Sequence, residues 1–123
     1  MRIVVLGSGT VGTSIADLLC RYRHSVTIVD EDPSNVRQLN AAMDVRAITG
    51  SASQSSVLFQ ADVLGADLCL AVTGDDEVNI VSASLAKAMG ARRSLASFYA
   101  HGFRDLSTFD YESHFGIDRM ISM

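Results

Sequence analysis

The first 30 residues of the chain constrain its fold more than any other segment. Residues 2–6 form a short, mainly apolar run, Arg-Ile-Val-Val-Leu, which is followed at once by Gly7-Ser8-Gly9-Thr10-Val11-Gly12. A second apolar run over residues 26–29 ends at Asp30. Short apolar runs bounded by glycine or by charge are typical of buried parallel strands. The segment therefore predicts a strand, a glycine turn, a helix and a second strand that ends in a carboxylate.

This Gly-x-Gly-x-x-Gly pattern is the arrangement that binds a dinucleotide when it lies between a strand and a helix. Gly7 permits the tight turn, Gly9 lets the backbone approach a pyrophosphate, and Gly12 lets the helix pack closely on the strand. The free N–H groups at the start of the helix favour phosphate. The alternative, a glycine turn that binds nothing, does not explain the flanking strand, the helix and the acid together.

Asp30 follows the last glycine at roughly the 20-residue distance at which an acid binds ribose in this motif. Its carboxylate can accept hydrogen bonds from both ribose hydroxyls of an adenosine. The same carboxylate would repel a 2′-phosphate. The pattern therefore favours NAD or an adenine nucleotide over NADP.

Composition excludes several other classes of protein. With 123 residues, 48% of them hydrophobic, the chain is expected to form one domain over residues 1–123. Its formal net charge of −4 gives no reason to expect nucleic acid as a partner. No apolar run approaches the length that spans a bilayer, so direct membrane insertion is not expected. Cys20 and Cys69 lack metal-site spacing and are interpreted as reduced core thiols of a cytoplasmic protein.

The rest of the chain alternates between strand and helix patterns. Further strands are expected at residues 26–29, 45–48, 68–72, 94–98 and 116–121. Helices are expected at residues 11–23, from Pro33 onward with Asp32 as the cap, at 55–64 and 78–89, and more weakly between 103 and 115. This alternation predicts an α/β fold, a Rossmann-like, doubly wound parallel sheet of about six strands in the order 3-2-1-4-5-6 with helices on both faces. The ligand would lie at the carboxyl ends of the first and fourth strands.

The loops at those strand ends supply the candidate cofactor-binding residues. Gly50, Ser51 and Ala52 are small enough for an adenine ring to lie against the backbone, and Thr73 and Gly74 would lie near the phosphates or a second ribose. Ordinary loop chemistry is the alternative for these two groups. Asp76 is expected to favour the positive start of the following helix, whereas Glu77 could contact ligand. The full candidate set is Gly7, Ser8, Gly9, Thr10, Val11, Gly12, Asp30, Glu31, Gly50, Ser51, Ala52, Thr73, Gly74 and Glu77.

The sequence offers no set of catalytic residues. His24 lies in a turn on the side opposite the expected site, and His101 and His114 have no matching nucleophile or carboxylate. Neither the HExxH nor the GxSxG motif occurs. A dehydrogenase would also need a second domain to hold its substrate against the nicotinamide. We therefore expect a binding domain and not an enzyme.

Taken together, these motifs resemble the N-terminal lobe of RCK (regulator of conductance of potassium) domains, also called TrkA-N or KTN domains. The stretch Ala-Asp-Leu-Cys-Leu-Ala-Val-Thr at residues 66–73, with Asp-Glu-Val-Asn at 76–79, separates this family from ordinary dehydrogenases better than the glycines do. The resemblance also includes residues 1–12, 26–30, 50–58 and 116–122. It implies a cytoplasmic, homo-oligomeric dimer or ring that binds NAD(H), ATP, ADP or AMP.

The resemblance further implies a regulatory role in potassium transport. The partner would be a membrane potassium channel or transporter subunit, with the domain peripheral to the inner face of the membrane. The chain has Thr10 where the family often has Gln or Arg, and Ser97 where the family often places an arginine over the phosphates. Two other interpretations remain open at this point: the coenzyme domain of an NAD-dependent dehydrogenase without its catalytic half, and a standalone NAD redox sensor.

Overall fold

A single parallel sheet runs through the computed structural model, which describes residues 1–103, 105 and 108–123. Its strand order is β3-β2-β1-β4-β5-β6 and every neighbouring pair is parallel, which confirms the predicted topology. Val5 of β1 pairs with Ile28 of β2 and with Leu70 of β4. The strands are β1 (Arg2–Leu6), β2 (Ser25–Asp30), β3 (Arg46–Thr49), β4 (Leu68–Ala71), β5 (Ser94–Phe98) and β6 (Arg119–Ser122).

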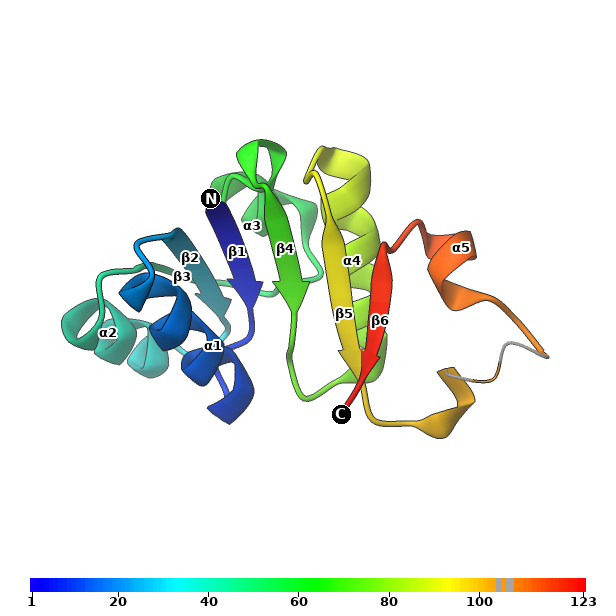
Figure 1. Cartoon of the computed structure of the whole chain (residues 1–123). Coiled ribbons are helices and arrows are strands. Elements are labelled where there is room, and N and C mark those ends of the chain that lie inside the picture. The colour runs from blue at the N-terminus through cyan, green and yellow to red at the C-terminus, as the bar shows by residue number, and fades with distance from the viewer. Residues whose placement is uncertain (104, 106–107) are drawn as a thin grey trace.

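Helices cover both faces of this sheet. Figure 1 shows α1 and α2 in front of the strands and α3 and α4 behind them, as right-handed crossovers require. The helices are α1 (Thr10–Arg21), α2 (Pro33–Ala42), α3 (Ser55–Gln60), α4 (Asp76–Met89) and α5 (Tyr111–Phe115), with short 3₁₀ turns η1 (Val63–Gly65) and η2 (His101–Phe103). Within the described ranges, no helix has the length and apolar character needed to cross a membrane.

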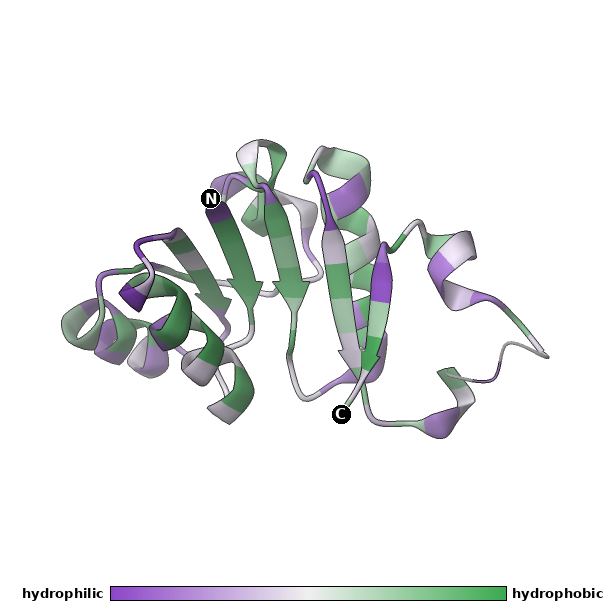
Figure 2. Ribbon diagram, viewed as in Figure 1, coloured by the Kyte–Doolittle hydropathy of each residue, from purple (hydrophilic) through white to green (hydrophobic). Residues whose placement is uncertain are grey.

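The central strand β1 divides the core into two layers. Val4 and Leu6 pack on the side of α3 and α4, whereas Ile3 and Val5 pack on the side of α1 and α2. Each of these four side chains is at most 3% exposed. Figure 2 shows the same feature as an almost continuous hydrophobic colour along β1 and β4. A strand buried on both faces explains why this run carries no alternating polar residues.

Several elements have bounds that differ from those expected, most clearly α3 and β6. Helix α3 stops at Gln60 because Asp62 adopts a left-handed conformation with φ 62°, and the 3₁₀ turn η1 follows. The strand predicted from residue 116 begins only at Arg119, since Gly116 ends α5 with φ 65°. The weaker helix expected somewhere between residues 103 and 115 is found, in the described part, as α5. Residues 104, 106 and 107 of that expectation lie outside the described residues.

Candidate functional site

A cavity of about 370 Å³ lies at the carboxyl ends of β1, β2 and β4. This is the sheet edge at which the strand order predicts a ligand. The arrowheads of the parallel strands point toward that edge in Figure 1. The cavity is lined by Gly7, Ser8, Gly9, Val29, Asp30, Glu31, Gly50, Ala52, Thr73, Gly74, Asp75 and Val78.

The glycine loop, residues 7–9, forms one wall of this cavity. Gly7 has φ +104°, and a Cβ atom there would lie 3.0 Å from the Cα atom of Thr73. A Cβ atom on Gly12 would lie only 2.0 Å from the carbonyl oxygen of Gly7. The tight turn and the close packing of helix on strand therefore agree with the roles expected of these two glycines.

Gly9 differs from the other two glycines because a Cβ atom there would meet no atom within 4 Å. It immediately precedes α1 and offers no side chain to cap the helix, and the first turn of α1 contains no acidic residue. The N–H groups at the start of α1 are thus left for another acceptor. A phosphate group is the acceptor that this geometry suits.

Asp30 ends β2 and faces the same cavity, half-buried. Its Oδ2 atom accepts hydrogen bonds from the hydroxyl of Ser8 and from the backbone N–H of Ser8, the latter at 3.2 Å. Its Oδ1 atom accepts from the backbone N–H of Asp32 at 2.7 Å. Asp32 in turn caps α2 by accepting from Ser34 N–H at 2.8 Å, as predicted. The carboxylate therefore joins the glycine loop to the start of α2.

The opposite wall is held by a residue absent from the predicted site, Asn79 of α4. Its side chain is fully buried. Asn79 Oδ1 accepts from Thr73 N–H at 2.9 Å and from the Thr73 hydroxyl at 2.6 Å, while Nδ2 donates to the Thr73 carbonyl at 3.0 Å. Nδ2 also donates to the carbonyl of Ser97 at 3.1 Å. The sequence signal was the Asp-Glu-Val-Asn stretch at residues 76–79, which supports the family resemblance but was not assigned to the site.

Ser97, the position at which the family often places an arginine over the phosphates, is buried among hydrogen-bond partners in this chain. Ser97 is only 4% exposed, and its hydroxyl donates to the Ala71 carbonyl at 3.3 Å. The hydroxyl also accepts from Asn79 Nδ2 at 3.2 Å. Position along β5 was inferred from the family pattern, but the side chain is directed into hydrogen bonds between neighbouring elements. Ser97 does not line the cavity.

The acidic segment at residues 75–77 is divided among three structural positions. Asp75 caps α4 by accepting from Glu77 N–H at 3.0 Å and Val78 N–H at 3.2 Å. Asp76, expected to favour the helix start, also accepts from Tyr99 N–H at 2.8 Å and Ala100 N–H at 2.9 Å. Glu77 is exposed and borders a separate cavity beside Tyr99. Among the residues with described positions, no His, Cys, Asp and Glu cluster could hold a metal ion.

Four other candidate residues, besides Glu77, lie near the cavity without lining it. Thr10 is exposed at the start of α1, and Gly12 is buried behind the glycine loop. Val11 borders an apolar groove on the α1 face of the sheet. Ser51 shares a hydrogen bond of 3.2 Å with the hydroxyl of Ser53. Their contact with ligand stays a prediction, as it does for the residues that line the cavity.

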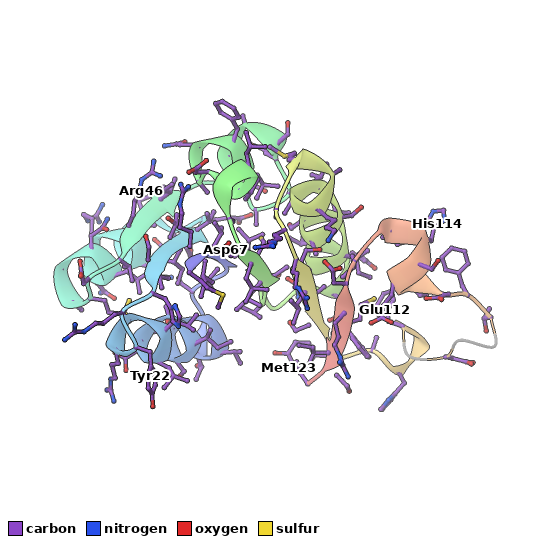
Figure 3. All side chains as sticks on the ribbon, turned by 45° about the horizontal axis from the view of Figure 1, so that its top comes forward. Tyr22, Arg46, Asp67, Glu112, His114 and Met123 are labelled. Carbon is purple, nitrogen blue, oxygen red and sulfur yellow. The ribbon has the colours of Figure 1, made fainter. Side chains whose placement is uncertain are left out.

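A larger cavity, of about 690 Å³, lies at the amino edge of the sheet. Figure 3 brings this edge forward and labels Arg46 and Asp67 there. Two of its arginines bind other protein groups: Arg2 pairs with Asp62, and Arg46 donates to the Gln60 carbonyl at 3.0 Å. It has neither a glycine loop nor the start of a long helix. The smaller cavity at the carboxyl edge is therefore the candidate site.

The histidines and cysteines do not line the candidate cavity. His24 precedes β2 at the amino edge, and His114 packs against the rings of Phe109 and Phe115. Both cysteines are free thiols. Cys69 is fully buried as predicted, whereas Cys20 is only partly buried. Burial raises the pKa of Cys69 to about 12.

Comparison with known proteins adds evidence from outside the chain. The family model of the TrkA-N domain matches residues 3–122. The Trk system potassium uptake protein TrkA of Halomonas elongata is 40% identical over 86 residues, which are 70% of this chain and 19% of that protein. The TrkA homolog of Archaeoglobus fulgidus is 45% identical over 92 residues, which are 75% of this chain and 21% of that protein. The chain thus spans about a fifth of the length of these relatives.

Solved structures share the fold at low sequence identity. The TrkA-N domain of the inner membrane protein ybaL from Escherichia coli has a TM-score of 0.85 at 16% identity, over 98% of this chain and 86% of that chain. The GsuK channel bound to NAD has a TM-score of 0.78 at 13% identity, over 98% of this chain and 21% of that chain. The Shewanella denitrificans Kef CTD in AMP-bound form has a TM-score of 0.79 at 17% identity, over 100% of this chain and 72% of that chain.

The family match and the sequence relatives agree with the motifs and with the fold. The match covers almost the whole chain, including the glycine loop, Asp30 and the segment from Thr73 to Asn79. The chain belongs to the TrkA-N family, the N-terminal domain of RCK domains, and is homologous to TrkA potassium uptake proteins.

Proposed function

We propose that this domain binds NAD(H) or an adenine nucleotide (AMP, ADP or ATP) in the carboxyl-edge cavity and thereby regulates a potassium channel or transporter. The observation that carries the proposal is the convergence of the glycine loop, the uncapped start of α1 and the Asp30 carboxylate on one cavity. The solved structures of the GsuK channel bound to NAD and of Kef CTD bound to AMP support the choice of ligand class.

The cavity suggests how such a ligand would be held. Asp30 would accept from the ribose hydroxyls, and Gly9 with the start of α1 would bind the phosphates. Gly50 and Ala52 would leave room for a flat adenine ring on the other side of Asp30. Each part of the ligand would thus meet the chemistry that suits it.

The charges around the cavity favour ligands with little phosphate charge. Among the residues that the structure describes, its lining contains three carboxylates, Asp30, Glu31 and Asp75, and no lysine, arginine or histidine. Additional phosphates would be repelled without a compensating cation. We therefore expect AMP and NAD to bind more tightly than ATP. This expectation rests on the negative charge of the cavity lining and not on the serine at position 97.

Regulation would pass through the contacts that connect the cavity to β5. Thr73 lines the cavity, and Asn79 connects it to β5. A ligand that binds one arrangement of this wall better than another would shift the population of that arrangement. In a cytoplasmic homo-oligomer attached to a membrane subunit, the shift would alter transport. The potassium-uptake relatives favour this role over a dehydrogenase or a standalone redox sensor.

Thermal unfolding in the presence of NAD, NADH, NADP, ATP, ADP or AMP tests the ligand class. A ligand that binds the folded protein raises its Tm by mass action. We expect NAD and AMP to raise Tm most and NADP least. Asp30→Ala should weaken NAD and AMP by about 1–3 kcal/mol, the usual loss for a hydrogen bond to a charged group. Equal binding of NADP and NAD would contradict the ribose role of Asp30.

A further inference from the structure

The acceptor capacity of Asp30 is almost fully used in this structure. A carboxylate offers about four lone-pair positions on its two oxygens. Three donors already occupy them: the Ser8 hydroxyl, the Ser8 N–H and the Asp32 N–H. One position remains for a ligand.

A ribose diol needs more than this single position. Its two hydroxyls each donate a hydrogen bond when an acidic residue binds both, so one existing donor has to leave the carboxylate. Only one of the three belongs to a rotatable side chain, the hydroxyl of Ser8. The other two are backbone N–H groups, whose departure would require the glycine loop or the start of α2 to move.

The backbone on both sides of Asp30 is held in place independently. The Thr13 hydroxyl donates to the Ser8 carbonyl at 2.9 Å, and Gly7 N–H donates to the Val29 carbonyl at 2.8 Å. On the other side, Asp32 is fixed as the cap of α2. Rotation of the Ser8 side chain therefore frees the required position without moving the loop.

We propose that Ser8 is a specificity-determining residue whose hydroxyl is exchanged for a ribose hydroxyl on Asp30 when the nucleotide binds. The inference rests on the proposed function, because it requires Asp30 to hold the ribose. When a ribose with both hydroxyls binds, the Ser8–Asp30 hydrogen bond is lost. A 2′-deoxyribose has only the 3′-hydroxyl, which can donate to the one free position on Asp30 while Ser8 stays in place. The hydroxyl of Ser8 thus reduces the preference for ribose over deoxyribose.

Isothermal titration with AMP and 2′-deoxy-AMP tests this exchange. We expect Ser8→Ala to raise the ratio of the Kd of 2′-deoxy-AMP to the Kd of AMP by about threefold to tenfold, the range given by one hydrogen bond in exchange with others. The two ligands share the adenine and the 5′-phosphate and differ only in the 2′-hydroxyl, so the ratio isolates the effect of that hydroxyl on Asp30. Ser14→Ala, an exposed serine of α1, is the matched control and should leave the ratio unchanged.

Ser8→Thr keeps the hydroxyl and should return the ratio to that of the unaltered protein, which separates the exchange from a general effect on the loop. An unchanged or lower ratio in a folded Ser8→Ala protein would overturn the inference while the proposed function stands. Failure of the unaltered protein to bind either nucleotide would overturn both. If Ser8→Ala does not fold, a ratio in Ser8→Gly equal to that of the unaltered protein is the contradicting result.

Discussion

The glycine-loop side of the cavity and the Thr73 side differ in what fixes their backbone. On the first side, Gly7 and Gly12 allow contacts that no side chain would permit. On the second side, the buried amide of Asn79 forms hydrogen bonds with the N–H, carbonyl and hydroxyl groups of Thr73. The first wall requires glycines, which have no Cβ atom, and the second requires the hydrogen bonds of Asn79. The two walls should therefore fail in different ways when they are altered.

The largest expected effect is on the glycine side. Gly12→Val should destabilise the protein by about 3 kcal/mol or more, because its Cβ atom would overlap the Gly7 carbonyl oxygen and the backbone would have to shift. Urea-induced unfolding measures this loss. Gly9→Val is the matched control, since its Cβ atom would meet open space. It should remain folded but lose nucleotide binding; unchanged affinity would exclude Gly9 from the site.

A smaller loss is expected from the polar wall. Asn79→Leu should destabilise by about 2–3 kcal/mol, because the partly buried N–H and carbonyl of Thr73 would lose their Asn79 partners. It should also weaken AMP binding, since Thr73 lines the cavity. The measurements are urea unfolding and titration calorimetry.

Ser82 provides the control for Asn79 on the same helix. It is fully buried, and within the described structure its hydroxyl has no hydrogen-bond partner. Ser82→Ala removes a hydroxyl that makes no bond, so stability should change by less than about 1 kcal/mol or increase. Equal losses in the two variants would show that helix packing, and not the amide network, holds the Thr73 wall.

The smallest effect is expected far from both walls, at the start of β6. Asp118 accepts from Lys87 Nζ and from Ser94 N–H, each at 2.8 Å. The hydrogen bond from Lys87, helped by that from Ser94, outweighs partial burial and lowers the pKa of Asp118. The pair is partly exposed, so its contribution should be less than about 1 kcal/mol.

A lowered pKa in the folded state fixes the direction of the pH dependence. The contribution of Asp118 is present above the ordinary aspartate pKa of about 4 and is lost as the pH falls through the lowered value. Asp118→Asn should therefore destabilise at neutral pH and have less effect in strong acid. Urea unfolding at both pH values tests this. AMP affinity should not change, and a clear loss would mean that β6 is coupled to the cavity.

The difference between the walls also explains what the sequence could predict. Strand order and the positions of the glycine loop and Asp30 could be predicted from local patterns, because apolar runs indicate strands and glycines indicate tight turns. The network around Asn79 was missed because its two partners lie elsewhere in the chain, Thr73 after β4 and Ser97 in β5. Only packing of α4 on the sheet brings these residues together. The same holds for Ser97: the sequence shows its place along β5 but not the hydrogen bonds that its hydroxyl makes with Asn79 and Ala71.

The end of α3 illustrates a second kind of miss. The apolar pattern of residues 55–64 continues beyond Gln60, so periodicity alone predicts a longer helix. Asp62 interrupts it with a left-handed conformation and pairs with Arg2 of β1. The early end of α3 thus coincides with an ion pair between residues far apart in the sequence, which the local sequence pattern does not predict.

The two thiols have a consequence for how this domain would respond to oxidants. Burial removes Cys69 from solvent and keeps it protonated, with a pKa of about 12. The pKa of Cys20 is also raised, by partial burial and then by the nearby charges of Asp44 and Asp17. Thiolates react with peroxides and disulfides far faster than thiols do. Neither cysteine is activated for such chemistry, so under the proposed function oxidants would reach this domain through its bound nucleotide and not through the protein's own sulfur atoms.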